Sequence, residues 1–214
     1  MDYLRMKEPV ETLNEIHISG LHFQPWVGDN YAAGTGLLLL GESHYIDRSC
    51  DDDDLSVGYD EWTRVVVRDE FLAGKMKETK FFDRIGWLFN PDDQYQIWQH
   101  IAFANLIQIG FPEKHCQPGP REIATIDPAF RLLLDGLRPS KVIILSKRLW
   151  TNWINKGEFV SPFSESGKNT QLRKYYFDDK EGSCLAIGIT HPSWMWGRTV
   201  HANWRSVVHK FLSI

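Results

Sequence analysis

Two short turns carry the side chains of this chain that are most capable of chemistry. The first, GESHY at residues 41–45, places a carboxylate, a hydroxyl, an imidazole and a phenol directly after an apolar run. The second, HPS at residues 191–193, places an imidazole directly after another apolar run. Carboxylates and imidazoles transfer protons or stabilise charge that develops in a transition state. The two turns can act together only if the fold brings them to one place.

Four short apolar runs are typical of strands that are covered on both faces. They are Gly36–Gly41, Ile101–Gln108, Lys141–Ser146 and Cys184–Thr190. Helical patterns lie between and after them, at Phe81–Phe89, Glu122–Leu137 and Ala202–Leu212. This alternation predicts an α/β fold: a three-layer sandwich with a central, mainly parallel four-stranded sheet flanked by helices. Residues 151–183 are polar and turn-rich, and their end predicts a hairpin into the last strand.

The ends of these strands predict the position of a binding site. In open α/β sheets, ligands bind beyond the carboxyl ends of the strands. Polar side chains follow three of the four runs there: Glu42, Ser43, His44, Tyr45 and Asp47, then Lys147 and Arg148, then His191 and Ser193. Asn105 interrupts the second run itself, and a buried amide needs hydrogen-bond partners or a ligand. We therefore expect a polar site at this edge of the sheet.

Length and composition limit the class of protein. A chain of 214 residues suits a single domain over residues 1–214. The net charge of −4 means that any binding to nucleic acid needs a local basic face. The three cysteines have no CxxC spacing, which predicts free thiols in a reducing cytoplasm. The N-terminus has no signal-peptide core, and no apolar run is long enough for a membrane span.

The two turns and the strands between them resemble the uracil-DNA glycosylase superfamily. Its first motif is a Gly-x-x-Pro-Tyr or Gly-Glu-x-Pro-Gly turn, which GESHY resembles, and its second begins His-Pro-Ser. The stretches IAFANLIQ, QPGPRE and LRPSKVIILS look like the same ordered region of the bacterial iron–sulfur branch. The resemblance spans about Leu37 to Leu212. It implies a monofunctional DNA glycosylase of base excision, which flips a base out of the DNA and hydrolyses its N-glycosidic bond.

The chain departs from the pattern of the superfamily at several positions. His44 stands at the proline of the first motif, and Ser43 stands where an Asp or Asn often positions the attacking water. The cysteines of the iron–sulfur branch are absent, so we expect no cluster, no metal and no other cofactor. The acidic run at residues 50–54 is typical of a solvated loop. The resemblance implies a modified pyrimidine as the substrate, either uracil or a hypermodified cytosine such as the glucosylated hydroxymethylcytosine of phage DNA. The altered, more polar pocket suits a bulky modified pyrimidine, and superfamily members that attack hypermodified phage cytosines in an anti-phage defence are an analogue.

The resemblance implies a role for each residue of the pocket. His191 would donate a hydrogen bond to a carbonyl of the leaving base. Glu42 matches the acid of the Gly-Glu-x-Pro-Gly branch, while Asp47 lies farther along the same turn, so both are candidate catalytic acids. Four further residues are candidates for holding the base, together with Ser43 and His44 at the pocket floor: Asn105 as the reader of its edge, Tyr45 as a pocket wall, and Phe81 or Phe82 as the stacking ring.

A second group of residues would contact DNA outside the pocket. In the superfamily, an apolar wedge lies four residues after the histidine, and Met195 occupies that position here, between Trp194 and Trp196. Ser193 lies in the same turn. Four cationic side chains are candidates for binding phosphates: Arg121, Lys147, Arg148 and Arg198. We expect DNA as the partner, either double-stranded with a flipped base or single-stranded, and a monomeric protein.

Two other functions remain open from the sequence. One is a nucleic-acid-binding relative without catalysis, because Ser43 cannot act as a general base at neutral pH. The other is a small-molecule serine hydrolase with Ser43 as nucleophile and His191 as base. GESHY is not the Gly-x-Ser-x-Gly elbow of such hydrolases, since Tyr45 replaces the final glycine.

Overall fold

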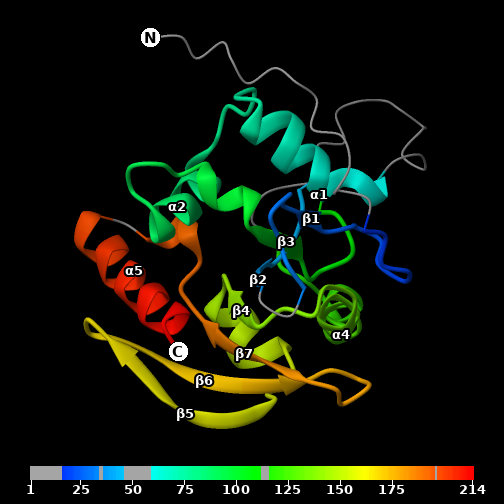
Figure 1. Ribbon diagram of the computed structural model, residues 1–214. Coiled ribbons are helices and arrows are strands. Elements are labelled where there is room, and N and C mark those ends of the chain that lie inside the picture. The colour runs from blue at the N-terminus through cyan, green and yellow to red at the C-terminus, as the bar shows by residue number, and fades with distance from the viewer. Residues whose placement is uncertain (1–15, 34–35, 46–58, 112–115, 196) are drawn as a thin grey trace.

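One seven-stranded mixed sheet organises the fold (Figure 1). The computed structural model describes residues 16–33, 36–45, 59–111, 116–195 and 197–214. The strand order across the sheet is β1-β3-β2-β4-β7-β6-β5. The strands are β1 (Trp26–Val27), β2 (Leu37–Gly41), β3 (Ile101–Asn105), β4 (Lys141–Ile144), β5 (Glu158–Glu165), β6 (Lys168–Tyr176) and β7 (Ser183–Gly188).

The four predicted strands form a continuous parallel block within this sheet. Strand β2 pairs in parallel with β3 and β4, and β4 pairs in parallel with β7. The predicted number of four strands is wrong, because β1 adds antiparallel to β3 and the β5–β6 hairpin adds antiparallel to β7. Most residues of the added hairpin strands are exposed or only partly buried, so no continuous apolar run marks them in the sequence. The predicted hairpin into the last strand is confirmed as β6 and β7.

The helices lie close to where their periodicity predicts them. They are α1 (Trp62–Arg64), α2 (Lys80–Phe89), α3 (Pro120–Ile123), α4 (Ile126–Leu137) and α5 (Arg198–Leu212), with two π-helical segments, η2 (Val65–Leu72) and η4 (Leu149–Trp153). Short 3₁₀ turns are η1 (Tyr59–Glu61), η3 (Gln96–Gln99) and η5 (Pro192–Trp194). The single helix expected over Glu122–Leu137 is divided into α3 and α4, and Pro128 lies in the first turn of α4, where proline is tolerated. Within the described ranges, every helix is too short or too polar to span a lipid bilayer.

Helices cover both faces of the parallel block, so its strands are buried on each side. Leu38 and Leu40 of β2 pack into the cluster that contains α4, whereas Leu39 packs into the cluster that contains α2 and α5. All three leucines are fully buried, and burying a leucine side chain contributes about 1.5–3 kcal/mol. These two cores hold the strands rigidly, so the polar residues after each strand have fixed positions.

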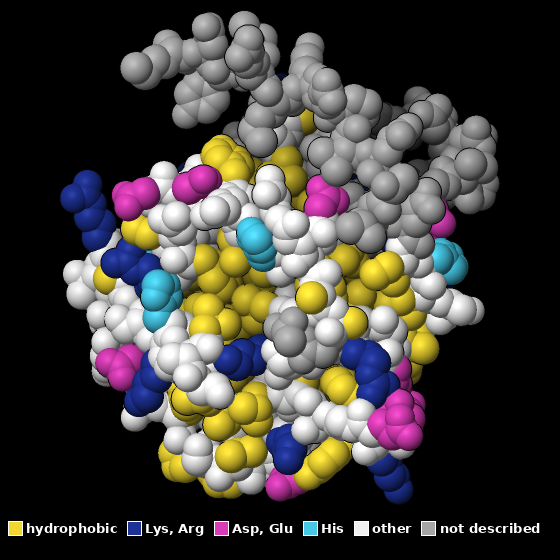
Figure 2. Space-filling model, viewed as in Figure 1, with side chains coloured by type: hydrophobic (Ala, Val, Ile, Leu, Met, Phe, Trp, Pro, Cys, Tyr) yellow, Lys and Arg dark blue, Asp and Glu magenta, His cyan; other side chains and the backbone are white. Residues whose placement is uncertain are grey.

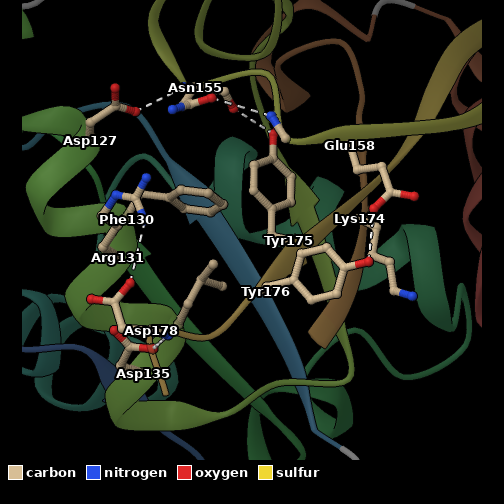
Figure 3. Close-up of a pocket in the computed structure, with 12 residues that line it drawn as sticks. Asp127, Phe130, Arg131, Asp135, Asn155, Glu158, Lys174, Tyr175, Tyr176 and Asp178 are labelled. Carbon is tan, nitrogen blue, oxygen red and sulfur yellow. Dashed lines mark hydrogen bonds and ion pairs between the residues drawn. The ribbon is translucent and has the colours of Figure 1, made fainter. Parts of the chain in front are cut away.

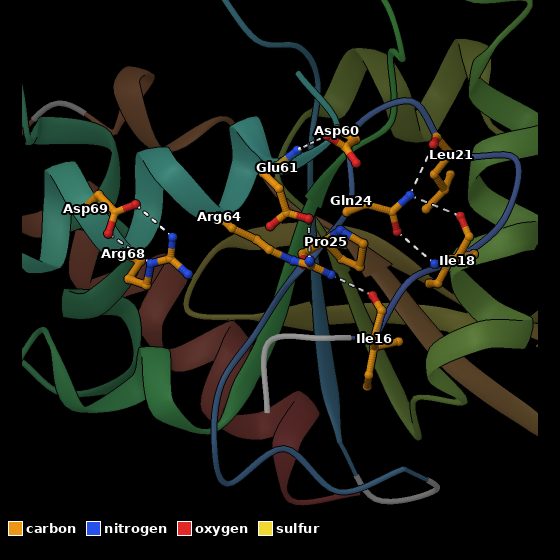
Figure 4. Close-up of polar contacts among 10 residues, drawn as sticks. All are labelled: Ile16, Ile18, Leu21, Gln24, Pro25, Asp60, Glu61, Arg64, Arg68 and Asp69. Atoms are coloured by element: carbon orange, nitrogen blue, oxygen red, sulfur yellow. Dashed lines mark hydrogen bonds and ion pairs between the residues drawn. The ribbon is translucent and has the colours of Figure 1, made fainter. Parts of the chain in front are cut away.

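The chain before β1 is tied down by two buried polar side chains (Figure 4). Gln24 is fully buried and exchanges hydrogen bonds with the backbone of Ile18. Arg64 of α1 is 4% exposed; its Nε donates to the Pro25 carbonyl at 3.0 Å and its Nη2 to the Ile16 carbonyl at 2.6 Å. These bonds fix α1 beside the N-terminal segment. The neighbouring residue Thr63 is thereby held at the site described below.

Replacing Arg64 by Met tests this anchor. Arg64→Met leaves two backbone carbonyls without their buried donors, so we expect the free energy of unfolding in a urea titration to fall by about 3 kcal/mol. Arg68→Met is the matched control, because Arg68 pairs with its neighbour Asp69 and both side chains are about half exposed. That variant should lower the free energy of unfolding by less than about 1 kcal/mol. Equal effects of the two substitutions would contradict the anchoring role.

Candidate functional site

The carboxyl ends of the four parallel strands meet at one edge of the sheet. Gly41 at the end of β2 lies opposite Asn105 of β3, and Ile144 of β4 lies opposite Gly188 of β7. The turns that carry Glu42 and His191 therefore leave the sheet at the same edge, as predicted. Figure 2 shows a recess lined by hydrophobic side chains near the middle of the molecular face viewed there, with histidine, lysine and arginine side chains around it.

His191 is held as a neutral hydrogen-bond donor. Its Nδ1 accepts a hydrogen bond of 3.2 Å from the backbone N–H of Ser193, so the ring proton resides on Nε2. Nε2 makes no hydrogen bond to a described residue. Burial, with a smaller effect from the charge of Arg148, lowers the pKa of His191 to about 4. At neutral pH the site thus presents an uncharged N–H donor.

Arg84 of α2 fixes the turn that carries this histidine. Its Nη1 donates to the carbonyls of Pro192 at 3.1 Å and Ser193 at 2.8 Å. The same helix contributes Phe81, whose ring centroid lies 5.1 Å from that of His191 with an angle of 30° between the planes. Arg84 was not a sequence candidate, because its partners lie more than a hundred residues away and are backbone atoms.

Glu42 is half of an ion pair that joins the ends of β2 and β4. Arg148 donates from Nη2 to Glu42 Oε1 and from Nε to Oε2, and Ser146 Oγ donates to Oε2 at 3.2 Å. Arg148 also donates to Gln117 Oε1 at 2.6 Å and lies over the ring of Trp153. Glu42 is thus a carboxylate fixed in place by Arg148 and Ser146. In turn it fixes the guanidinium of Arg148, whose charge contributes to lowering the pKa of His191.

His44 and Asn105 form a second polar cluster at the same edge of the sheet. Asn105 Nδ2 donates to His44 Nε2 at 3.2 Å, and Thr63 Oγ1 lies 2.9 Å from the same nitrogen. Since an amide nitrogen only donates, His44 Nε2 accepts and the ring proton resides on Nδ1. A Cβ at Gly41 would lie 2.1 Å from Asn105 Oδ1, so only glycine there admits the amide. Asn105 Oδ1 makes no hydrogen bond to a described residue.

The structure buries the aromatic candidates to different extents, and Phe81 is partly buried. Phe81 lies beside His191, whereas Phe82 is 8% exposed and stacks on Phe71 in the core. The prediction that Phe82 is available to stack on a base is therefore wrong. Tyr45 is 45% exposed at the end of the first turn, next to Phe111.

The prediction of an exposed wedge at Met195 is wrong. Met195 is 2% exposed and packs into the core cluster that contains Trp204, because the turn closes with a hydrogen bond from the Met195 amide to the Pro192 carbonyl. Trp194 is instead 68% exposed, so among the described residues of this turn it presents a large apolar side chain to solvent. Asp47 and Trp196, and the acidic run at 50–54, lie outside the described residues.

The remaining cationic candidates are Arg121, Lys147 and Arg198. Their side chains are exposed, as a role in binding phosphates requires. Ser43 makes no hydrogen bond to a histidine within the described ranges, so the structure gives no nucleophile–base pair for a serine hydrolase there. Among the described residues, no group of three or more His, Cys, Asp or Glu side chains is arranged to hold a metal ion.

A separate cavity of about 300 Å³ lies between α4 and β6 (Figure 3). Its polar groups already satisfy one another: Tyr175 donates to the Asn155 carbonyl, Tyr176 to Glu158, and the Asp178 amide to Asp135. None of the predicted site residues lines it. We interpret this cavity as a structural feature of the contact between α4 and β6.

Comparison of the sequence with models of known protein families finds no match, and comparison with curated proteins finds none either. Functional inference for this chain therefore depends on the geometry of the strand edge and on the motifs that form it.

The buried histidine His44 predicts a pH-dependent stability. Burial lowers its pKa to about 3, so between pH 6.5 and pH 3 the unfolded chain binds a proton that the folded protein does not. The free energy of unfolding should fall as the pH drops through this range, by up to about 1.4 kcal/mol per pH unit. Urea titrations at pH 7, 6, 5 and 4 measure the slope.

Two variants separate the titration of His44 from its packing. His44→Gln keeps a polar side chain but removes the titrating group, so its slope between pH 6.5 and 4 should be shallower than that of the wild type. Thr63→Val removes the hydroxyl at the ring but leaves the imidazole buried, so it should lower stability and keep the slope. A wild-type slope in His44→Gln would contradict the assignment.

Proposed function

We propose that the protein is a DNA N-glycosylase that excises a modified pyrimidine. The observation that carries the proposal is His191, a neutral imidazole whose Nε2–H bonds to no described residue and lies at the carboxyl edge of the sheet beside the ring of Phe81. A flipped pyrimidine presents a carbonyl oxygen and a flat face, which match this donor and this ring. The resemblance of GESHY and HPS to the motifs of the superfamily supports the same function.

The proposed reaction breaks the bond between C1′ of the sugar and the pyrimidine nitrogen. The electron pair of that bond passes to the base, and the His191 Nε2–H donates a hydrogen bond to the carbonyl oxygen where the negative charge collects. A water oxygen bonds to C1′ and loses its proton, while the released base takes a proton from solvent. Glu42 and Asp47 are the candidate carboxylates that orient this water. The products are an abasic site and the free base.

Asn105 is the candidate reader of the base edge. Its Nδ2 donates one of its two N–H groups to His44, so the amide offers a ligand the acceptor Oδ1 and the second N–H. An amide with both groups can pair with the edge of a cytosine or of uracil, so Asn105 does not select between them. The preference for a hypermodified cytosine rests on the first turn, where Ser43 and His44 stand in place of the residues usual in the motif of the superfamily.

A second candidate function is DNA binding without catalysis. The observation that favours it is the state of Glu42, whose two oxygens already accept hydrogen bonds from Arg148 and Ser146. Such a protein would bind DNA in a salt-dependent way and yield no abasic sites.

An excision assay tests the proposal directly. Duplexes and single strands that carry cytosine, uracil, hydroxymethylcytosine or glucosylated hydroxymethylcytosine are incubated with the protein, and abasic sites are revealed by alkaline cleavage. We expect cleavage at a modified cytosine. His191→Ala should reduce the single-turnover rate by about 10²–10³, the usual effect of removing one oxyanion donor.

His209→Ala is the control for this assay, because His209 is an exposed histidine of α5. It should keep the wild-type rate. Abasic sites from uracil alone would contradict the assignment of a cytosine substrate, and no abasic sites from any substrate would favour the non-catalytic candidate.

A further inference from the structure

A basic groove adjoins the candidate site. This cavity of about 470 Å³ lies between η4 and strand β6, and three of its lining residues are cationic: Lys147, Lys156 and Arg173. The other described lining residues are neutral, and no Asp or Glu is among them. Lys147 and Lys156 are exposed, so their ammonium groups are accessible to a ligand. In a chain with a net charge of −4, this is a local concentration of positive charge.

Arg173 is a buried cation whose described partners are neutral. It is 5% exposed, and its guanidinium lies over the ring of Trp150 at 3.8 Å. It donates to the Trp150 carbonyl and to Gln171 Oε1. No carboxylate of the described residues forms an ion pair with it. A buried charge is costly unless it is paired, so the groove is suited to an anion that supplies the missing charge.

The groove continues from the strand ends that form the candidate site. Lys147 lies between Ser146 and Arg148, which both hold Glu42. Gly188 lines the groove and ends β7, the strand that leads into the turn with His191. Figure 2 shows several Lys and Arg side chains over the part of the face below the recess, where Figure 1 places β6 and β7. A strand of DNA whose base enters the site would therefore meet the groove with its adjacent phosphates.

We propose that this groove binds the phosphate backbone of the DNA strand next to the flipped nucleotide. The inference rests on the proposed function and deepens it, because it names the track of the substrate strand. Lys147 and Lys156 contact phosphates, and Arg173 supplies a fixed positive charge at the floor of the groove. The cavity between α4 and β6 offers a more acidic environment, since its lining carries four carboxylates, Asp127, Asp135, Glu158 and Asp178, against two cations, Arg131 and Lys174.

The salt dependence of DNA binding tests the groove. Fluorescence anisotropy with an unmodified labelled oligonucleotide gives the affinity of the wild type and of the double variant Lys147→Gln/Lys156→Gln at several salt concentrations. For each phosphate that a lysine no longer neutralises, the slope of log K against log salt should become shallower by about 0.7 for single strands or 0.9 for duplexes. Lys180→Gln is the matched control, because Lys180 is an exposed lysine of the turn between β6 and β7, away from the groove, and should keep the wild-type slope.

The outcomes separate the groove from the proposed catalysis. A shallower slope in the double variant supports the groove even if no substrate yields abasic sites. A slope equal to that of Lys180→Gln overturns the groove even if abasic sites form. Labelled polyglutamate is measured in parallel. If the double substitution weakens the binding of polyglutamate and leaves the binding of DNA unchanged, the proposal is also overturned, because the groove then recognises acidic protein.

Discussion

The hydrogen bond from the Ser193 amide to His191 Nδ1 is the interaction on which the proposed function of the site depends. It assigns the ring proton to Nε2 and directs that N–H away from the turn. Burial keeps the imidazole uncharged, and Arg84 holds the two carbonyls that set the shape of the turn. An imidazole that was free to rotate or to take up a proton would act as a general acid of ordinary strength. The imidazole of His191 is instead neutral and fixed, so its Nε2–H dipole keeps one orientation.

The parallel block of the fold could be predicted from the sequence because β2, β3, β4 and β7 are buried on both faces and read as continuous apolar runs. The β5–β6 hairpin could not, because most of its side chains are exposed or only partly buried. The position of the site at one edge of the sheet followed from the parallel block, because residues that follow parallel strands lie at the same edge. Met195 was placed wrongly because the direction of a side chain in a turn is set by hydrogen bonds that the sequence does not reveal.

Contacts between distant segments account for what sequence reasoning missed at the site. Thr63 reaches His44 only because Arg64 anchors α1 to the N-terminal segment, and Arg84 reaches the HPS turn only because α2 packs against it. Neither Thr63 nor Arg84 belongs to a motif. The positions of Glu42 and Asn105 likewise depend on partners across the sheet. Glu42 is half of an ion pair with Arg148, and Asn105 donates to His44.

The neutral state of His191 is the central claim, and the pH dependence of single-turnover base excision tests it most directly. With a pKa of about 4, the imidazole keeps its Nε2–H and carries no charge throughout the range from about pH 5.5 to 8. We therefore expect an excision rate from glucosylated hydroxymethylcytosine DNA that does not fall as the pH rises through 6.5. A rate that declines tenfold per pH unit above pH 6.5 would show that the imidazolium is the active form and would contradict the account.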